Sequence, residues 1–343
     1  MAQYLRRFLK RNFRPAAVIL ACVAYLCGVG GAALALTRAE MYQATAPVTD
    51  RGEAAQTAAF QNAMKTVLIR VTGRRNADED PALSPLISNA RRYVQQYRAA
   101  PDNQLWVTFD GAAIERWLTQ NSQPLWGHER PTTLVLLAVQ STAQGGSVIA
   151  TDDTSELKSA VDGAAVARGL PLVWPSAAEL QRFHIDFSAV NGGSPSTYLD
   201  MARRMGSEGV LIGRASGASA SANVRWTHLF QDRSSEYSGT LEGVNRAADM
   251  YAGLFAASGG LVPVAIEVSG VNDLRDYASV ESYLESLTFI SHVSVESLSG
   301  DTVRFRLSTR GGVDSLQRAL TLNGRLQPLA AGENGIQRFQ LRR

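Results

Sequence analysis

Cysteine is almost absent from this chain of 343 residues, and the only two, Cys22 and Cys27, lie within its first 39 residues. The rest of the chain therefore offers neither a disulfide nor thiol chemistry. Histidine is also scarce: the four histidines are 44 to 64 residues apart, with no H-E-x-x-H motif and no His/Cys pair. This spacing argues against a zinc site.

Motifs for nucleotide binding and acyl transfer are missing as well. Beyond residue 39 there is no G-x-S-x-G elbow, no G-x-x-x-x-G-K-[ST] loop and no strand-linked G-x-G-x-x-G. Acids cluster at Asp78-Glu79-Asp80 and Asp152-Asp153, but a general acid needs a pKa raised by burial, and these runs lie in polar loops. We interpret them as solvated turns and helix N-termini. The sequence thus predicts no catalytic residue, no metal and no cofactor.

Charge is absent from residues 15–37, an apolar run that follows a basic cluster of Arg6, Arg7, Lys10, Arg11 and Arg14. This order predicts a signal peptide over residues 1–39, with Ala33-Leu34-Ala35 as the first A-x-A cleavage site and Thr37-Arg38-Ala39 as the second. The alternative is a signal anchor, because about 20 apolar residues can span a bilayer. Lipidation at Cys22 is disfavoured, since the apolar run continues well past it.

Either form of the leader predicts export. We expect a periplasmic protein, or one anchored in the cytoplasmic membrane with the bulk of its chain in the periplasm and no other membrane contact. The leader also carries the basic excess: without residues 1–39 the chain has 28 basic against 31 acidic residues, a net charge of −3. Nucleic-acid binding therefore loses its main support.

The roughly 300 exported residues exceed what one core usually organises. We predict an N-terminal α+β domain over 40–130, a mixed-sheet α/β layer domain over 131–260 and a ferredoxin-like domain over 261–343. The overall fold class is α/β and α+β.

In the first domain, apolar residues repeat with helical spacing over 52–71 and again over 82–97. Asp50 is the expected N-cap of the first helix, and Gly73 its end. The full set of expected elements is an extended segment 41–48, helices 52–71 and 82–97, a strand 105–109 and a short helix capped by Asp110.

The middle domain alternates strands and helices, which is typical of crossover connections in one sheet. Residues 132–139 are apolar on both pleat faces, as in a central strand. The expected elements are strands 132–139, 170–174 and 209–213, helices 154–168, 196–205 and 243–255, and a hairpin of 222–230 with 236–241.

The last domain reads β-α-β-β-α-β, the order of a ferredoxin-like split βαβ unit. We expect Val293, Val295, Val303, Phe305 and Leu307 to point inward, with a turn at Ser299-Gly300-Asp301. The expected elements are strands 264–268, 293–298 and 302–308, helices 273–287 and 313–320, and an extended segment 326–341.

Four residues are candidates for an interaction site: Trp126, Arg130, Arg74 and Arg75. Tryptophan and arginine are typical interface anchors, and the arginine pair at 74–75 could bind an anion or a lipid headgroup. The structural alternative has Trp126 closing the core of the first domain, Arg130 bonding a helix C-terminus, and the pair complementing a helix dipole.

Three short sequence motifs resemble those of a known family: Val-Thr-Gly-Arg at 71–74, Tyr-Val-Gln-Gln-Tyr at 93–97 and Trp-Gly-x-x-Arg-Pro at 126–131. Residues 40–260 thereby resemble the Gram-negative proteins of domain-of-unknown-function family two thousand and sixty-six. The resemblance implies an exported envelope protein without assigned activity. The layout of 131–260 is also similar to the amino-terminal domain of the periplasmic protein TolB, a likeness of fold alone.

Together these observations predict a non-enzymatic binding or scaffolding protein of the periplasm with an envelope protein as partner. The alternatives are a small-ligand binding module in the middle domain and an unrecognised envelope hydrolase. A cleft with converging buried ionisable groups would favour the hydrolase.

Overall fold

The computed structural model describes residues 36–50, 52–141, 145–322, 324–332 and 335–342. The expected signal peptide or signal anchor therefore lies, apart from residues 36–39, outside the described residues. Within these ranges, no helix combines the length and the apolar character that crossing a membrane requires. The described residues belong to one compact unit.

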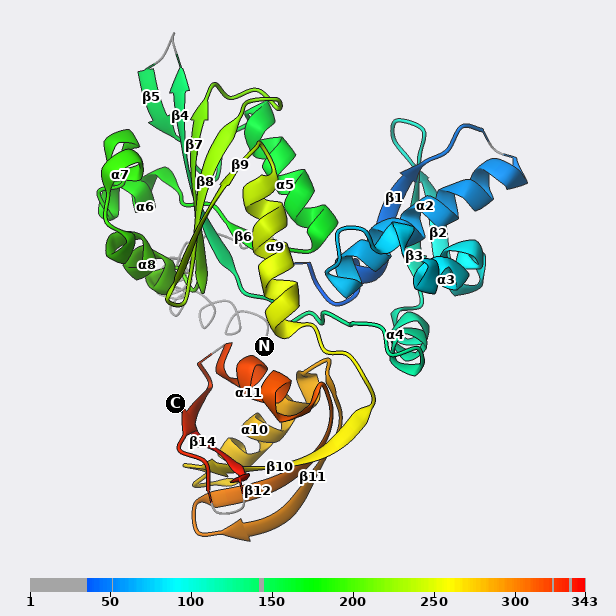
Figure 1. Ribbon diagram of the computed structural model, residues 1–343, viewed down its shortest axis with the longest axis vertical. Coiled ribbons are helices and arrows are strands. Elements are labelled where there is room, and N and C mark those ends of the chain that lie inside the picture. The colour runs from blue at the N-terminus through cyan, green and yellow to red at the C-terminus, as the bar shows by residue number, and fades with distance from the viewer. Residues whose placement is uncertain (1–35, 51, 142–144, 323, 333–334, 343) are drawn as a thin grey trace, which may run out of the picture. The chain divides into compact units, whose positions relative to one another are not determined.

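Three separate sheets divide the described residues into an N-terminal, a middle and a C-terminal module, each with its own buried core. The N-terminal core ends at Leu125, the middle core runs from Trp126 to Phe255, and the C-terminal core begins at Ala257. The domain boundaries expected at 130 and 260 stay predictions. The chain is mixed α/β and α+β, as predicted (Figure 1).

The N-terminal module is an antiparallel sheet of order β1-β3-β2 that packs against a long helix, α2. Asp110 caps the last helix, α4, as predicted, because its carboxylate accepts from the Ala113 N–H at 3.0 Å. The elements are β1 (Gln43–Pro47), α2 (Glu53–Thr72), α3 (Ser84–Ser88), β2 (Val94–Ala100), β3 (Gln104–Phe109) and α4 (Gly111–Gln120), with 3₁₀ turns at 40–42, 77–79, 81–83 and 90–93.

Helix α2 buries the apolar stripe that its sequence predicts, formed by Phe60, Ala63, Met64, Val67, Leu68 and Val71. It ends at Gly73, whose φ of 73° costs a glycine little. The helix begins within one residue of the predicted start, but the predicted cap is wrong, because the N-cap is Gly52 and not Asp50. Asp50 instead accepts a hydrogen bond from the Gly52 N–H at 2.6 Å, just ahead of the helix.

The helix expected over 82–97 is also wrong. The chain forms short helical turns up to Tyr93 and then strand β2, which pairs antiparallel with β3. The hairpin turn between them holds Asp102 and Asn103 at φ 57° and 53°, the left-handed pair that matches the twist of a tight hairpin. Tyr97 is consequently 51% exposed and packs edge-on against Phe60 instead of lying on a buried helix face.

The middle module is a mixed sheet of order β5-β4-β7-β8-β9, with β6 also paired to β4. Strand β4 runs parallel to β6 and β7, as the crossover pattern predicts, and the remaining pairs are antiparallel. The strands are β4 (Thr133–Ser141), β5 (Gly145–Val148), β6 (Leu172–Val173), β7 (Gly209–Ser216), β8 (Val224–Phe230) and β9 (Arg233–Ser238). Of these, β5 was not foreseen.

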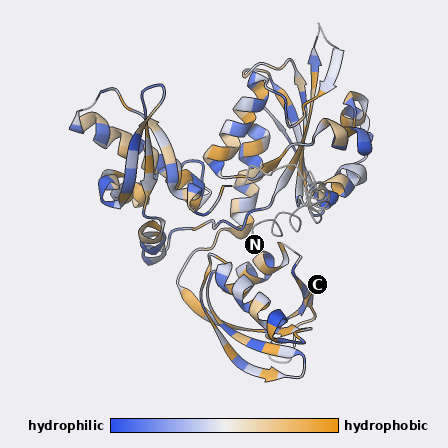
Figure 2. Ribbon diagram, turned by 180° about the vertical axis from the view of Figure 1, so that it is seen from behind, coloured by the Kyte–Doolittle hydropathy of each residue, from blue (hydrophilic) through white to orange (hydrophobic). Residues whose placement is uncertain are grey.

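Helices cover both faces of this sheet (Figure 1). Helices α5 (Glu156–Arg168) and α9 (Glu242–Phe255) pack on one face, while α6 (Ala177–Arg182), α7 (Phe187–Gly192) and α8 (Pro195–Arg204) pack on the other. Strand β4 is buried on both sides, since alternate residues enter the two opposite cores. The flanking helices mix hydrophobic and hydrophilic colours, as amphipathic helices should (Figure 2).

Three polar side chains meet inside the core of the middle module. The Tyr251 hydroxyl lies 2.9 Å from His228 Nε2 and 3.1 Å from Thr133 Oγ1, and all three residues are fully buried. Burial lowers the pKa of His228 from 6.5 to about 4 and raises the pKa of Tyr251. Both side chains are therefore neutral at pH 7.

Acidification should destabilise the protein through His228. Because the folded pKa lies below the unfolded one, the unfolded chain binds the proton first, and stability falls as the pH drops from about 6.5 to about 4, by up to about 3 kcal/mol. Urea unfolding between pH 7 and 4 measures this loss. His228→Gln should flatten the slope, whereas His292→Gln, an exposed position on the C-terminal sheet, should keep it. Equal slopes in both variants would contradict the assignment.

The C-terminal module begins with the predicted β-α-β-β-α order. Its elements are β10 (Leu261–Ser269), α10 (Leu274–Ser286), β11 (Ile290–Ser299), β12 (Thr302–Arg310), α11 (Gly312–Leu322), β13 (Leu326–Leu329) and β14 (Gln337–Leu341). The sheet order is β11-β12-β10-β14-β13. Strand β12 thus lies between β10 and β11, as a split βαβ unit requires.

The closing segment departs from the prediction, because it forms a hairpin of two strands. Strand β13 runs antiparallel to β14, and β14 runs parallel to β10. Strand β13 therefore has the direction of the last strand of a ferredoxin-like unit, while β14 is inserted between it and β10. The module is a ferredoxin-like unit with one added strand.

The predicted inward register holds for β12, where Val303, Phe305 and Leu307 are buried. Gly300 forms the β11–β12 turn at φ 60°, as expected. Val293 is half-buried, and Val295 lies opposite Phe305 on the same sheet face, as predicted, but it is 44% exposed instead of buried. It lies on the edge strand β11, directly before a register shift.

Candidate functional site

The segment 126–131, Trp-Gly-His-Glu-Arg-Pro, opens the middle module and bonds to both of its neighbours. Toward the N-terminal module, its first N–H donates to Val71 O of α2 at 2.7 Å. Toward the C-terminal module, Glu129 Oε1 accepts from the Thr288 N–H at 2.6 Å, and His128 Nδ1 lies 2.7 Å from Thr288 Oγ1. The segment therefore connects the three modules.

Arg130 is the centre of this segment. It is 7% exposed, and each of the five N–H donors of its guanidinium meets a backbone carbonyl. The guanidinium also lies 3.8 Å from the centre of the Trp126 ring, a cation–π distance. Burial, with the nearby Arg70 charge, holds the pKa of Arg130 well below its usual value. The acceptors, at 2.8–2.9 Å, are the carbonyls of Gly127, Arg168, Gly169, Arg70 and Trp126.

Two helix C-termini balance the Arg130 charge. The last four carbonyls of an α-helix lack partners in the helix and form the negative end of its dipole. The Arg70 carbonyl belongs to the last turn of α2, and the Arg168 carbonyl to the last turn of α5. Arg130 thus binds the ends of two helices from two modules, which is the structural role foreseen for it.

Arg70 and Arg168 make similar contacts and were missed from the sequence. Arg168 donates hydrogen bonds from Nη2 to Gly73 O at 2.8 Å and to Asp249 Oδ1 of α9 at 2.6 Å. Burial lowers the pKa of Arg70 to about 10. The acceptors of Arg70, at 2.8–3.2 Å, are the carbonyls of Glu40, Met41, Gln43 and Val166. We call Arg70, Arg130 and Arg168 the arginine junction.

Trp126 is 1% exposed and belongs to the core of the middle module. The structural alternative placed it in the core of the first domain, a position that the preceding Leu125 takes instead. Because Trp126 and Arg130 are both buried, their side chains contact other parts of this chain and are not available to a separate partner.

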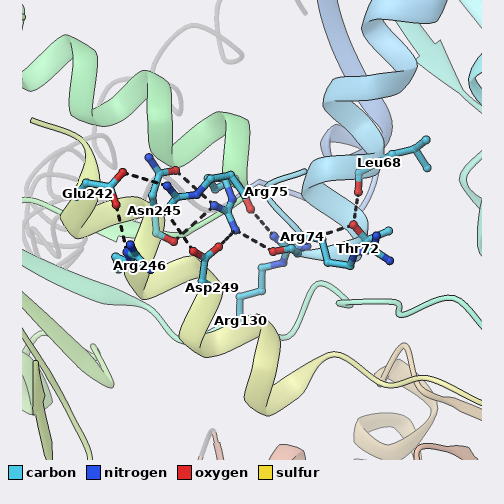
Figure 3. A network of polar contacts seen from close by, with 11 residues as sticks. Leu68, Thr72, Arg74, Arg75, Arg130, Glu242, Asn245, Arg246 and Asp249 are labelled. Atoms are coloured by element: carbon cyan, nitrogen blue, oxygen red, sulfur yellow. Dashed lines mark hydrogen bonds and ion pairs between the residues drawn. The ribbon is translucent and has the colours of Figure 1, made fainter. Parts of the chain in front are cut away.

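Arg75 and Arg74 are partly exposed, but both are paired. Arg75 donates to Glu242 at 3.0 Å and to Asp249 at 3.1 Å, two carboxylates of α9, and Figure 3 shows its guanidinium turned toward that helix. Arg74 pairs with Asp80 inside the N-terminal module. An anion or lipid headgroup would have to displace these carboxylates.

The acidic clusters make local contacts only. Asp80 accepts from the Ala82 N–H at 2.8 Å, and its hydrogen bond from Arg74 holds the pKa of Asp80 below its usual range, opposite to what a general acid needs. Asp153 accepts from the Ser155 N–H at 2.8 Å, ahead of α5. In the part of the chain that the structure describes, no group of three His, Cys, Asp or Glu side chains could hold a metal ion.

Comparison with known protein families gives a match to the first part of the chain. Residues 35–127 match a family described as "Domain of unknown function (DUF8605)", and this range coincides with the N-terminal module. This family differs from the one that the sequence motifs resemble. The earlier resemblance and the likeness to TolB therefore stay predictions. No curated protein and no solved structure matches the chain.

Proposed function

We propose that the protein is an exported, non-enzymatic binding or scaffolding protein of the cell envelope. The arginine junction carries this proposal. Its three guanidinium groups cross-link the N-terminal and middle modules through buried hydrogen bonds, and Glu129 ties the C-terminal module to the same segment. Buried, bonded contacts of this kind limit relative motion, which suits a chain that presents several surfaces together.

The charged groups selected from the sequence favour this function over the alternative of an envelope hydrolase. Arg74, Arg75 and Asp80 are engaged in ion pairs, and Asp153 is engaged in a turn. Their charge thus stabilises structure, whereas a hydrolase would direct such groups into a shared cleft. The second alternative, a small-ligand module, is supported by a cleft in the middle module, described below.

Cell fractionation followed by crosslinking tests the proposal. The chain should appear in the periplasm or on the periplasmic side of the cytoplasmic membrane, and a cytosolic chain would refute it. If the leader is cleaved, mass spectrometry should find Leu36 first. Cleavage there keeps the Arg38–Glu115 ion pair at 3.2 Å and the Thr37–Glu40 hydrogen bonds at 2.8 Å, whereas cleavage after Ala39 removes both.

Crosslinked envelopes should then yield an envelope protein in constant ratio to this chain. The control is an unrelated exported protein carried through the same purification, which should not retain that partner. A chain that is always recovered alone would contradict the scaffold function, even where export is correct.

A further inference from the structure

A polar cleft of about 660 Å³ lies on the middle module. Its floor is formed by strands β7, β8 and β9 on the sheet face that α7 and α8 cover only in part. One wall is formed by the end of α7 and the start of α8, where Asn191, Gly193, Pro195 and Tyr198 line it. None of the junction arginines lines this cleft.

The strand register sets charged side chains together on the floor. Arg214 of β7 is the cross-strand partner of Arg225 of β8, and Arg225 is the partner of Ser238 of β9. The next row holds Thr227 and Glu236. Directly opposed residues of an antiparallel pair point to the same face with Cβ atoms about 5 Å apart. All five residues line the cleft.

An opposed pair of arginines is unfavourable unless something neutralises it. Within the described ranges, no carboxylate forms an ion pair with Arg214 or Arg225, and the guanidinium of Arg214 makes one hydrogen bond, at 3.3 Å, to Thr227 Oγ1. Glu236 lines the same cleft without bridging to either arginine. The contrast with the bonded guanidinium groups of the arginine junction indicates a site whose counter-ion comes from solution.

We propose that this cleft binds a small molecule bearing an oxyanion, either a phosphate or a carboxylate. Arg214 and Arg225 bind its oxygens, because planar guanidinium forks match two-oxygen groups. Thr227 and Ser238 supply hydroxyl groups beside them. The site goes beyond the scaffold function, since it lies within one module and a scaffold without a ligand would remain a scaffold.

Glu236 gives the proposal a test of sign. Its carboxylate repels an anion held in the neighbouring row, so Glu236→Gln should tighten binding, whereas loss of either arginine should weaken it. Arg233→Gln controls for a nonspecific effect of net charge. It removes one positive charge, as the two arginine variants do, but from an exposed position on β9 that does not line the cleft.

Calorimetric titration of the purified mature protein with inorganic phosphate, and separately with acetate, at fixed ionic strength measures these effects. We expect saturable binding, weakened about tenfold in Arg214→Gln and in Arg225→Gln, strengthened in Glu236→Gln and unchanged in Arg233→Gln. The tighter of the two anions identifies the ligand class. Circular dichroism confirms that each variant is folded. If one arginine variant does not fold, the other and Glu236→Gln decide.

Absence of binding to both anions would overturn the inference, as would equal affinity in all folded variants. Neither result would bear on the scaffold function, which the envelope crosslinking tests separately.

Discussion

Replacing Arg130 with lysine should destabilise the protein by about 3 kcal/mol or more, although the positive charge is kept. Five carbonyls share this guanidinium, and an ammonium has only three donors and no planar fork. A buried acceptor left without its donor costs about 1–3 kcal/mol. Chemical unfolding, followed by tryptophan fluorescence, measures the loss.

Arg75→Gln is the matched control for this experiment. Arg75 also joins the N-terminal module to the middle one, but its side chain is 41% exposed and its two ion pairs are in contact with solvent. Such pairs contribute less than about 1 kcal/mol. A similar loss in both variants would show that the number of contacts between modules matters and that the burial of Arg130 does not.

The elements that sequence predicted well are those in which one local pattern dominates. In α2, the buried stripe and the glycine at its end agree, so the helix follows from them. The 94–100 strand was missed because Tyr93 and Tyr97 also fit a helical stripe. Its pairing with β3 and the left-handed turn at 102–103 make this segment a strand. The periodicity of one segment does not show which other segment it pairs with.

Only Arg130 of the arginine junction could be predicted, for a related reason. Arg130 stands out because a short link with tryptophan and proline surrounds it. Arg70 does not, because its acceptors come from carbonyls 27 to 96 residues away. Arg214 and Arg225 likewise look like single polar positions in two strands, and only the register places them side by side.

Truncating Phe305 to alanine should cost about 3–5 kcal/mol and unfold the C-terminal module first. Phe305 is fully buried on β12, with its ring stacked 6.1 Å from that of Tyr277 on α10, so alanine leaves a cavity between sheet and helix. Urea unfolding of the full chain, with hydrogen exchange to assign the module, measures the effect.

Two neighbouring variants separate burial from strand propensity. Arg304 lies on the opposite sheet face and forms an ion pair with Glu267 in which the arginine side chain is 38% exposed. Arg304→Ala removes this pair and should lower the free energy of unfolding by less than about 1 kcal/mol. Val295→Ala removes the cross-strand partner of Phe305 on the same face. Because Val295 is half exposed, this substitution should also lower the free energy of unfolding by less than about 1 kcal/mol. The ordering matters more than any single value. If Val295→Ala were as damaging as Phe305→Ala, the edge of this sheet would be covered in solution, and the exposed position of Val295 would be wrong.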